Sequence, residues 1–338
     1  MIKQAIIKLT ANKDLTLTEA SNLIDFLAEG QATGGQIGAF LTALKMKGET
    51  IEEITGFASR MRERALKIDT TPFENIVDSC GTGGDCSNTF NISTASAILA
   101  SSSGLHVVKH SNFGFTSRCG SSNVLEALNI NLVKTPADAE DALRKDNIVF
   151  IHAPYFHKST AHVNPVRKEL GIRTVFNFLG PLTNPACPTG QVLGVADPNL
   201  CPKIAEVLKN LGCKRALVVN GQNPTLDEIS ISGKTLVYRL DNGKIDNFYL
   251  EPEDLGIKRV KIEDIAGGEP PENAGIITDI LNNKITGSRL DAVLVNTAGV
   301  LWAGYKADNL VDGIKLAGEL ISSGSAAKKL LSIQACCD

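Results

Sequence analysis

The alternation of short β-rich runs with helical stretches between residues 75 and 240 constrains the fold of this chain more than any other feature. Runs rich in valine and isoleucine occupy residues 75–79, 106–110, 147–153, 191–196, 215–221 and 235–240. Helix-forming stretches separate many of them, at residues 94–103, 122–130, 139–146 and 201–212. Parallel strands need such crossover helices, which then cover both faces of a sheet. The pattern predicts an α/β fold with a mostly parallel central sheet.

The first 68 residues contain helical signals only. Thr16 with Glu19, and Thr50 with Glu53, have the spacing of capping boxes. In that motif a hydroxyl and a carboxylate satisfy free backbone N–H groups at the start of a helix. We therefore expect a small helical N-terminal domain, with apolar stripes that pack on a neighbour.

Two further segments complete the domain prediction. Helix returns from about residue 271, and residues 164–185 interrupt the α/β alternation. This interruption begins helically and ends among glycines and prolines, which do not continue a helix. We predict a helical domain at residues 1–68, joined in space by about 164–185, and a larger α/β domain at residues 69–338.

Composition excludes some classes of protein. The chain has 338 residues, 43% of them hydrophobic and 21% charged, with a net charge of −3. A nucleic-acid-binding surface usually shows a basic excess, so we expect no nucleic-acid partner. The most apolar late run, residues 290–305, includes Asp291 and Asn296 and is too short to span a bilayer. It predicts a buried helix and no membrane partner.

Targeting and cysteine usage favour a cytoplasmic protein. The first fifteen residues carry several charges and no uninterrupted apolar core, so we expect no signal peptide. The eight cysteines form no CxxC pair, which indicates reduced thiols, most of them buried. All five histidines lie between residues 106 and 162, but without the ligand spacing of a zinc site.

Residues 80–92 connect a predicted strand to a predicted helix. Gly81, Gly83 and Gly84 allow the backbone to approach a ligand closely, and free N–H groups there favour an anion such as phosphate. Asp85 is an unusual neighbour for a phosphate, and could hold ribose hydroxyls or a backbone N–H. The segment matches neither the dinucleotide nor the P-loop motif, so alone it equally fits a tight turn before a capped helix.

A second segment of the same kind follows the next strand. Residues 107–128 run from a strand through a hydroxyl-rich loop into a helix, with Lys109 and Arg118 as fixed positive charges. Loops after neighbouring parallel strands lie at the same edge of a sheet, where ligands bind in α/β proteins. The two loops together predict a site for one anionic ligand, and a diphosphate is the natural candidate.

Several segments in order resemble the anthranilate phosphoribosyltransferase family. They are DSCGTGGD, FNIST, KHSN with SRCGSSNVLEAL, VRKELGIRTVFNFLGPLTNPA and LDEIS, and with the helical N-terminus they cover essentially the whole chain. The resemblance implies transfer of phosphoribose from phosphoribosyl pyrophosphate (PRPP) to the amine of anthranilate, with release of pyrophosphate, in tryptophan biosynthesis. It also implies Mg²⁺ as cofactor and a homodimer formed through the helical domain.

The resemblance further implies binding residues, position by position. Those for PRPP are Gly81, Gly84, Asp85, Thr89, Asn91, Ile92, Ser93, Thr94, Lys109, Ser117 and Ser121. Those for anthranilate are Gly81, Asn112 and Arg167, and those for Mg²⁺ are Ser93, Asp227 and Glu228. We expect His110 to position the acceptor, and we assign no acid–base catalyst because the amine of anthranilate is already an uncharged nucleophile.

The chain departs from the family pattern at a few positions. Ser111 and Phe113 replace a glycine and an arginine, Asn123 stands where aspartate is common, and Lys158 replaces a proline after His157. These changes affect loop geometry and the entry path of the acceptor, but leave the phosphate, carboxylate and metal groups in place.

Two of the implied roles have plainer alternatives. Asp227–Glu228 taken alone would be a solvated acidic turn, and Arg167 a surface arginine beside Lys168. Arg173 is a second guanidinium in the same segment, which could compete for the carboxylate or instead fix the loop.

Two other functions stay open from the sequence. A pyrimidine nucleoside phosphorylase would share the fold and a GTGGD-like loop, but would not need the acidic pair. A nucleic-acid-binding relative without chemistry is disfavoured by the net charge of −3.

Overall fold

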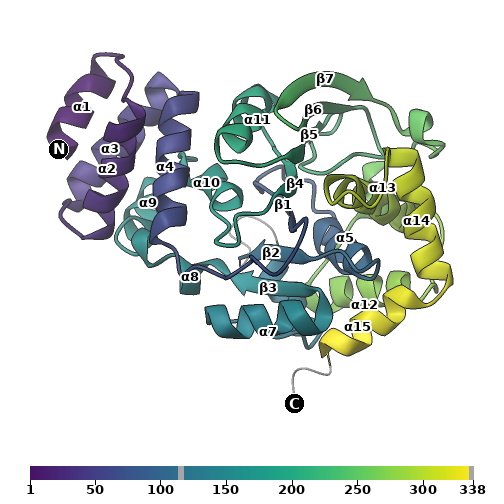
Figure 1. Ribbon diagram of the computed structural model, residues 1–338. Coiled ribbons are helices and arrows are strands. Elements are labelled where there is room, and N and C mark those ends of the chain that lie inside the picture. Colours follow the sequence, from purple (N-terminus) through teal and green to yellow (C-terminus); the bar gives the residue numbers. More distant parts are fainter. Residues whose placement is uncertain (113–117, 335–338) are drawn as a thin grey trace.

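A seven-stranded, mostly parallel sheet forms the centre of the molecule (Figure 1). The computed structural model describes residues 1–112 and 118–334. The sheet order is β3-β2-β1-β4-β5-β6-β7, with β3 to β5 parallel and β6 and β7 antiparallel additions. The strands are β1 (Val77–Gly81), β2 (Val107–Ser111), β3 (Ile148–His152), β4 (Gly190–Gly194), β5 (Arg215–Gly221), β6 (Thr235–Asp241) and β7 (Lys244–Leu250).

Helices surround this sheet and form a separate unit at one end of the molecule (Figure 1). The N-terminal helices are α1 (Ile2–Thr10), α2 (Leu17–Ala28), α3 (Gly34–Lys47) and α4 (Ile51–Arg64). The next are α5 (Ile92–Ser101), α6 (Ser121–Ala127), α7 (Pro136–Asp146), α8 (Ala153–Phe156), α9 (Asn164–Leu170), α10 (Phe176–Leu182) and α11 (Cys201–Asn210). The last are α12 (Pro270–Leu281), α13 (Ser288–Ala303), α14 (Leu310–Ser322) and α15 (Ser325–Gln334).

Both faces of the sheet are covered by helices, as the alternation of elements predicts. Neighbouring residues of β2 face opposite ways: Val107 packs among residues of α5 and α13, whereas Val108 packs against α7. The first face carries α5 and α12 to α15, and the second carries α7, α10 and α11. Strands buried on both sides place their loops at the sheet edge, where a ligand can reach them.

The N-terminal helices begin where the sequence predicts. Thr16 Oγ1 accepts the N–H of Glu19 at 3.2 Å, and the Glu19 carboxylate accepts the N–H of Thr16 at 2.9 Å. The same reciprocal pairing opens α4 at Thr50, and a third capping box, which sequence analysis missed, opens α3 at Thr33. These caps fix the ends of the helices that pack beside the sheet.

The segment at residues 164–185 packs on the N-terminal helices, with α9 against α3 and α10 against α4. Val175, Phe178 and Leu182 share one apolar core with α1 to α4. That core continues into α11 and one face of the sheet, so the apolar contacts do not stop at residue 68. The division into domains at residues 68 and 164–185 therefore stays a prediction.

Two local differences from the sequence analysis stand out. Strand β7 was not predicted, although Asn242 (φ 48°) and Gly243 (φ 85°) form the tight turn that an Asn-Gly pair favours between antiparallel strands. Helix α10 also runs through Gly180 and Pro181, so this short helix includes a proline that cannot donate a backbone hydrogen bond.

The late apolar run and most of the described cysteines are buried, as the sequence predicts. Helix α13, predicted from the late apolar run, is almost entirely buried against the sheet. No helix in the described part of the chain is long and apolar enough to cross a membrane. Of the six described cysteines, all free, four are buried, whereas Cys86 and Cys187 are exposed.

Candidate active site

The two loops predicted to bind an anion converge at the carboxyl edge of the sheet. Strands β1 and β2 are adjacent and parallel, so the segments that follow them lie side by side. We call residues 81–91 the glycine loop and residues 112–120 the second loop, of which 113–117 lie outside the described residues. The amide of Asn91 donates to the carbonyl of Cys119 at 3.1 Å, which joins the two loops directly.

The glycine loop lies against the acidic pair that follows β5. The N–H of Gly83 donates to Oδ2 of Asp227 at 2.7 Å. A Cβ at Gly81 would overlap the same carboxylate, so only glycine permits this approach. Gly83 and Gly84 have φ values of 68° and 80°, which other residues rarely adopt. The pair is therefore part of the cleft and not a solvated turn.

Three acidic side chains gather under the glycine loop. Glu228 Oε1 accepts the N–H of Ser93 at 3.1 Å, and Asp85 Oδ2 accepts the N–H of Asp227 at 3.4 Å. Burial, then repulsion from Asp85, raises the pKa of Asp227 to about 7. Burial, then repulsion from Asp227, raises the pKa of Glu228 to about 8. Three carboxylates thus lie together at this end of the cleft, and a bound cation would lower the repulsion between them.

Lys109 supplies the fixed positive charge beside these carboxylates. It is only 1% exposed, and its ammonium group contacts the Ser79 carbonyl and Ser93 Oγ, the latter at 3.2 Å. Its charge lowers the pKa of Glu228 against the larger effect of burial. Lys109 therefore links β1 to the start of α5, and Glu228 of the acidic pair contacts the same start of α5 through the N–H of Ser93.

His110 points from β2 to the opposite side of the sheet. Its Nδ1 lies 3.0 Å from the Gly180 carbonyl, and since a carbonyl only accepts, Nδ1 carries the proton. Burial, then the neighbouring His157, lowers the pKa of His110 to about 3, so the ring is neutral at neutral pH. Its Nε2 is buried, has no hydrogen-bond partner among the described residues and is an acceptor. His110 lines the cavity, but its Nε2 has almost no exposed surface.

The segment from α9 to α10 brings two arginines to the cleft. Arg167 is half-buried, hydrogen-bonds Asn164 at 3.1 Å and lies over the Phe176 ring at 5.6 Å. Burial lowers its pKa, and no carboxylate of the described residues forms an ion pair with it. Arg173 instead donates to the carbonyls of Gly83 and Gly84, at 2.8 and 3.0 Å. The sequence left open whether Arg173 binds a carboxylate or fixes the loop, and in the structure it binds the glycine loop.

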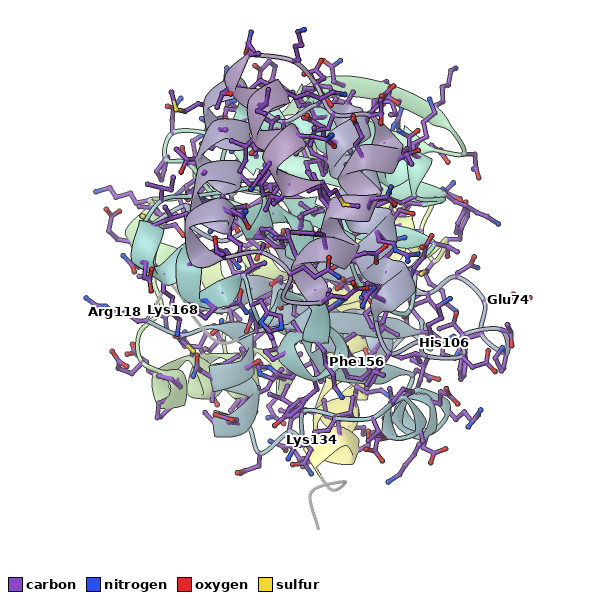
Figure 2. All side chains as sticks on the ribbon, turned by 90° about the vertical axis from the view of Figure 1, so that its left-hand side faces the viewer. Glu74, His106, Arg118, Lys134, Phe156 and Lys168 are labelled. Atoms are coloured by element: carbon purple, nitrogen blue, oxygen red, sulfur yellow. The ribbon has the colours of Figure 1, made fainter. Side chains whose placement is uncertain are left out.

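These groups line one cavity of about 570 Å³. The predicted residues that line it are Gly81, Gly84, Asp85, Thr89, Asn91, Ile92, Ser93, Lys109, His110, Asn112, Ser121, Arg167, Asp227 and Glu228. Thr94 does not line the cavity, because its side chain is buried within α5, and Ser117 lies outside the described residues. Figure 2, viewed from the side of the N-terminal helices, shows Lys168 and Arg118 projecting at the same edge of the molecule.

Sequence analysis missed two buried residues that support the site. Asp78 on β1 is fully buried, accepts from Asn184 at 2.9 Å and from the N–H of His110 at 3.4 Å, and has its pKa raised by burial. Asn273 on α12 donates to the Asn91 side chain at 3.0 Å. A polar residue inside an apolar strand or helix is a weak signal, because its partner comes from a distant segment.

The histidines do not form a metal site among the described residues, where no group of three potential ligands from His, Cys, Asp and Glu is found. His152 pairs with Ser122 Oγ at 3.1 Å, as expected for a structural residue.

Fold and site together define a two-part glycosyltransferase. Residues 3–65 match the helical bundle domain of a glycosyl transferase family, and residues 73–327 match its a/b domain. An anthranilate phosphoribosyltransferase of Acetivibrio thermocellus is 47% identical over 330 residues, covering 98% of this chain and 95% of that protein. The chain belongs to the anthranilate phosphoribosyltransferase family.

Solved structures agree with this assignment. The crystal structure of the enzyme from Thermus thermophilus has a TM-score of 0.90 at 37% identity, covering 98% of each chain. The Saccharomyces cerevisiae enzyme in complex with PRPP and Mg has a TM-score of 0.87 at 30% identity, covering 98% of this chain and 96% of that one. The same yeast enzyme in complex with 4-fluoroanthranilate has a TM-score of 0.86 at 30% identity, covering 99% and 97%.

The raised pKa values of the acidic pair predict how stability depends on pH. Between about pH 4, where carboxyls of an unfolded chain titrate, and the folded values of about 7 and 8, the folded state holds protons that the unfolded state has released. The stability of the ligand-free protein should therefore fall as pH rises through this window. The double variant Asp227→Asn, Glu228→Gln should lose much of that dependence.

Thermal unfolding in buffer free of divalent cations, at a series of pH values, measures this difference. Asp141→Asn, at a carboxylate with 80% of its side chain exposed, is the control and should keep the slope of the unchanged protein. An equal slope in the double variant would contradict the assigned protonation.

Proposed function

We propose that this protein transfers the phosphoribosyl group of PRPP to the amine of anthranilate, forming N-(5-phosphoribosyl)anthranilate and pyrophosphate in tryptophan biosynthesis. One observation carries the proposal: a single cavity brings together two amide-rich loops, an acidic pair and Arg167. A diphosphate, a metal ion and a carboxylate each find complementary groups there. The relatives named above have this activity in their names, and none of them supports a nucleoside phosphorylase.

The proposed donor site lies at the two loops. Backbone N–H groups of the glycine loop, the start of α5 and the ammonium of Lys109 would bind phosphate oxygens. The proposed PRPP ligands along these segments are Gly81, Gly84, Asp85, Thr89, Asn91, Ile92, Ser93, Lys109 and Ser121. The side chain of Asn91 donates a hydrogen bond to the Cys119 carbonyl and accepts one from the Asn273 side chain. It would therefore orient the loops as well as contact the substrate.

Magnesium fits the acidic end of this site. Asp227, Glu228 and the hydroxyl of Ser93 offer oxygen ligands only, which Mg²⁺ prefers, together with water and substrate phosphates. Burial first, and mutual repulsion second, raise the pKa values of the two carboxyls, and a cation would relieve that repulsion. When bound there, the ion would neutralise charge on the leaving pyrophosphate.

The proposed acceptor site lies across the cavity. Arg167 would hold the carboxylate of anthranilate with paired N–H donors, and Asn112 lines the cavity nearby. His110 also lines the cavity, but its Nε2 is buried, so the ring would position the acceptor by its shape and not by a hydrogen bond from Nε2. Since the pKa of His110 is only about 3, the ring would not act as a strong base.

Positioning then carries most of the proposed catalysis. Loss of pyrophosphate builds positive charge on the ribose and negative charge on the leaving group, which the bound cation would neutralise. Holding an uncharged amine opposite the anomeric carbon removes the entropic cost of the encounter.

Loss of anthranilate fluorescence on incubation with PRPP and Mg²⁺ tests the reaction directly. We expect turnover that needs all three components and that stops when EDTA removes the metal. Asp227→Ala should abolish most of the activity and weaken the Mg²⁺ dependence, because it removes a proposed metal ligand. Folded protein without turnover, as judged by circular dichroism, would refute the proposal.

Substitution of Arg167 separates its role from that of the loops. Arg167→Ala should raise the KM for anthranilate by about 10- to 100-fold, the effect of losing hydrogen bonds to a charged group, and change the KM for PRPP little. Arg144→Ala, an exposed arginine on α7, is the control and should change neither. Equal increases of both KM values would contradict the assignment.

We further propose that the protein forms a homodimer through the N-terminal helices. Ile7 on α1 and Met46 on α3 are 67% and 83% exposed, and α1 packs against α3, so both lie on one helical unit. Exposed apolar side chains on neighbouring helices favour a protein partner. A cytoplasmic location is consistent with the six free cysteines of the described residues.

Charged substitutions at this surface should break the dimer. The double variant Ile7→Glu, Met46→Glu should sediment as a monomer where the unchanged protein sediments as a dimer, because burying two carboxylates at an interface is costly. Leu331→Glu, at a 65% exposed leucine on α15 far from these helices (Figure 1), is the control. A dimer that survives the double substitution would place the interface elsewhere.

A further inference from the structure

Arg173 holds the glycine loop from the side opposite the acidic pair. It lies in the short link between α9 and α10, and its guanidinium donates to the carbonyl of Gly83 at 2.8 Å and to that of Gly84 at 3.0 Å. Asp227 accepts the N–H of Gly83 at 2.7 Å. Gly83 is thus fixed at its N–H by one part of the chain and at its carbonyl by another.

These carbonyl contacts determine the direction of two amide groups. In a trans peptide the C=O and the following N–H point in opposite directions, and the only cis peptide among the described residues is Asn223–Pro224. The N–H groups of Gly84 and Asp85 therefore point away from the guanidinium. No hydrogen bond within the described residues uses either N–H, and both residues line the cavity.

The loop needs such a restraint because two successive glycines do not fix their own conformation. Gly83 and Gly84 both have positive φ, and glycine moves between this region and negative φ at little cost. A flipped peptide would turn a carbonyl oxygen toward a bound anion in place of an N–H. A Cβ at Gly84 would also overlap Nη1 of Arg173, so the contact itself depends on glycine at this position.

The charge of Arg173 is not used elsewhere in the described structure. It is exposed, lines the cavity, and forms no ion pair with a carboxylate of the described residues. It also lies six residues after Arg167, so the same segment supplies the residue proposed to bind anthranilate and the residue that contacts the glycine loop.

We propose that Arg173 is a positioning residue for PRPP: by binding the Gly83 and Gly84 carbonyls, it keeps the N–H groups of Gly84 and Asp85 directed at the pyrophosphate. This inference rests on the proposed function for the identity of the anion. It predicts that Arg173 acts on the donor substrate, although it lies on the same segment as the proposed acceptor residue.

Steady-state kinetics of Arg173→Ala test the selectivity of the effect. The KM for PRPP should rise about tenfold, which corresponds to the loss of two ordinary hydrogen bonds, while the KM for anthranilate changes less than about twofold. Arg144→Ala is the control. An unchanged KM for PRPP, or an equal rise in both KM values, would overturn the inference.

Hydrogen exchange of the substrate-free protein gives a readout that does not depend on activity. Peptides covering residues 81–91 should exchange faster in Arg173→Ala, and Arg173→Lys should restore protection only in part, since one ammonium lacks the planar fork. Unchanged exchange would overturn the inference even if the enzyme is active. Faster exchange in a protein without transferase activity would instead refute the proposed function and leave the loop contact standing.

Discussion

The hydrogen bond from Gly83 to the Asp227 carboxylate is the contact on which the geometry of the cleft depends. It joins the segment after β1 to the segment after β5, although β4 lies between these strands. A side chain at Gly81 or at Gly194 would overlap Asp227, so glycine on both β1 and β4 is what lets the two segments meet. Because of this approach the acidic pair lies beneath the amide-rich loop, where donors for an anion and ligands for a cation are neighbours.

This arrangement concentrates like charges in a place shielded from water. Asp227 and Glu228 are held near Asp85, and among the described residues Lys109 is the cation that opposes them from within. Burial of unpaired carboxylates destabilises the folded state. It therefore raises the pKa values of Asp227 and Glu228 to about 7 and about 8, so both carboxyls keep their protons to higher pH than usual. A metal site needs carboxylates held close together in this way, so stability is lower where the chemistry requires it.

Local sequence signals predicted most of the fold and the two loops that meet at the cleft. Six strands and the helices between them follow from β-rich runs and helical periodicity, and the caps at Thr16 and Thr50 from their spacing. The Asn-Gly turn before β7 was a signal that could have been used. Asp78 and Asn273 could not be predicted, because a buried polar residue is recognised only by the partner that folding brings to it.

The sequence by itself determined the α/β alternation, the two glycine- and hydroxyl-rich loops after neighbouring strands, and the family resemblance. These are local properties, set by the residue types and their spacing. Only the tertiary structure decided that the acidic pair lies under the glycine loop and that Nδ1 of His110 binds the Gly180 carbonyl. It also decided that Arg173 binds loop carbonyls, while Arg167 has no carboxylate partner within the described part of the chain. Those outcomes depend on strand order and on the packing of α9 and α10 against the N-terminal helices, which join residues far apart in the chain.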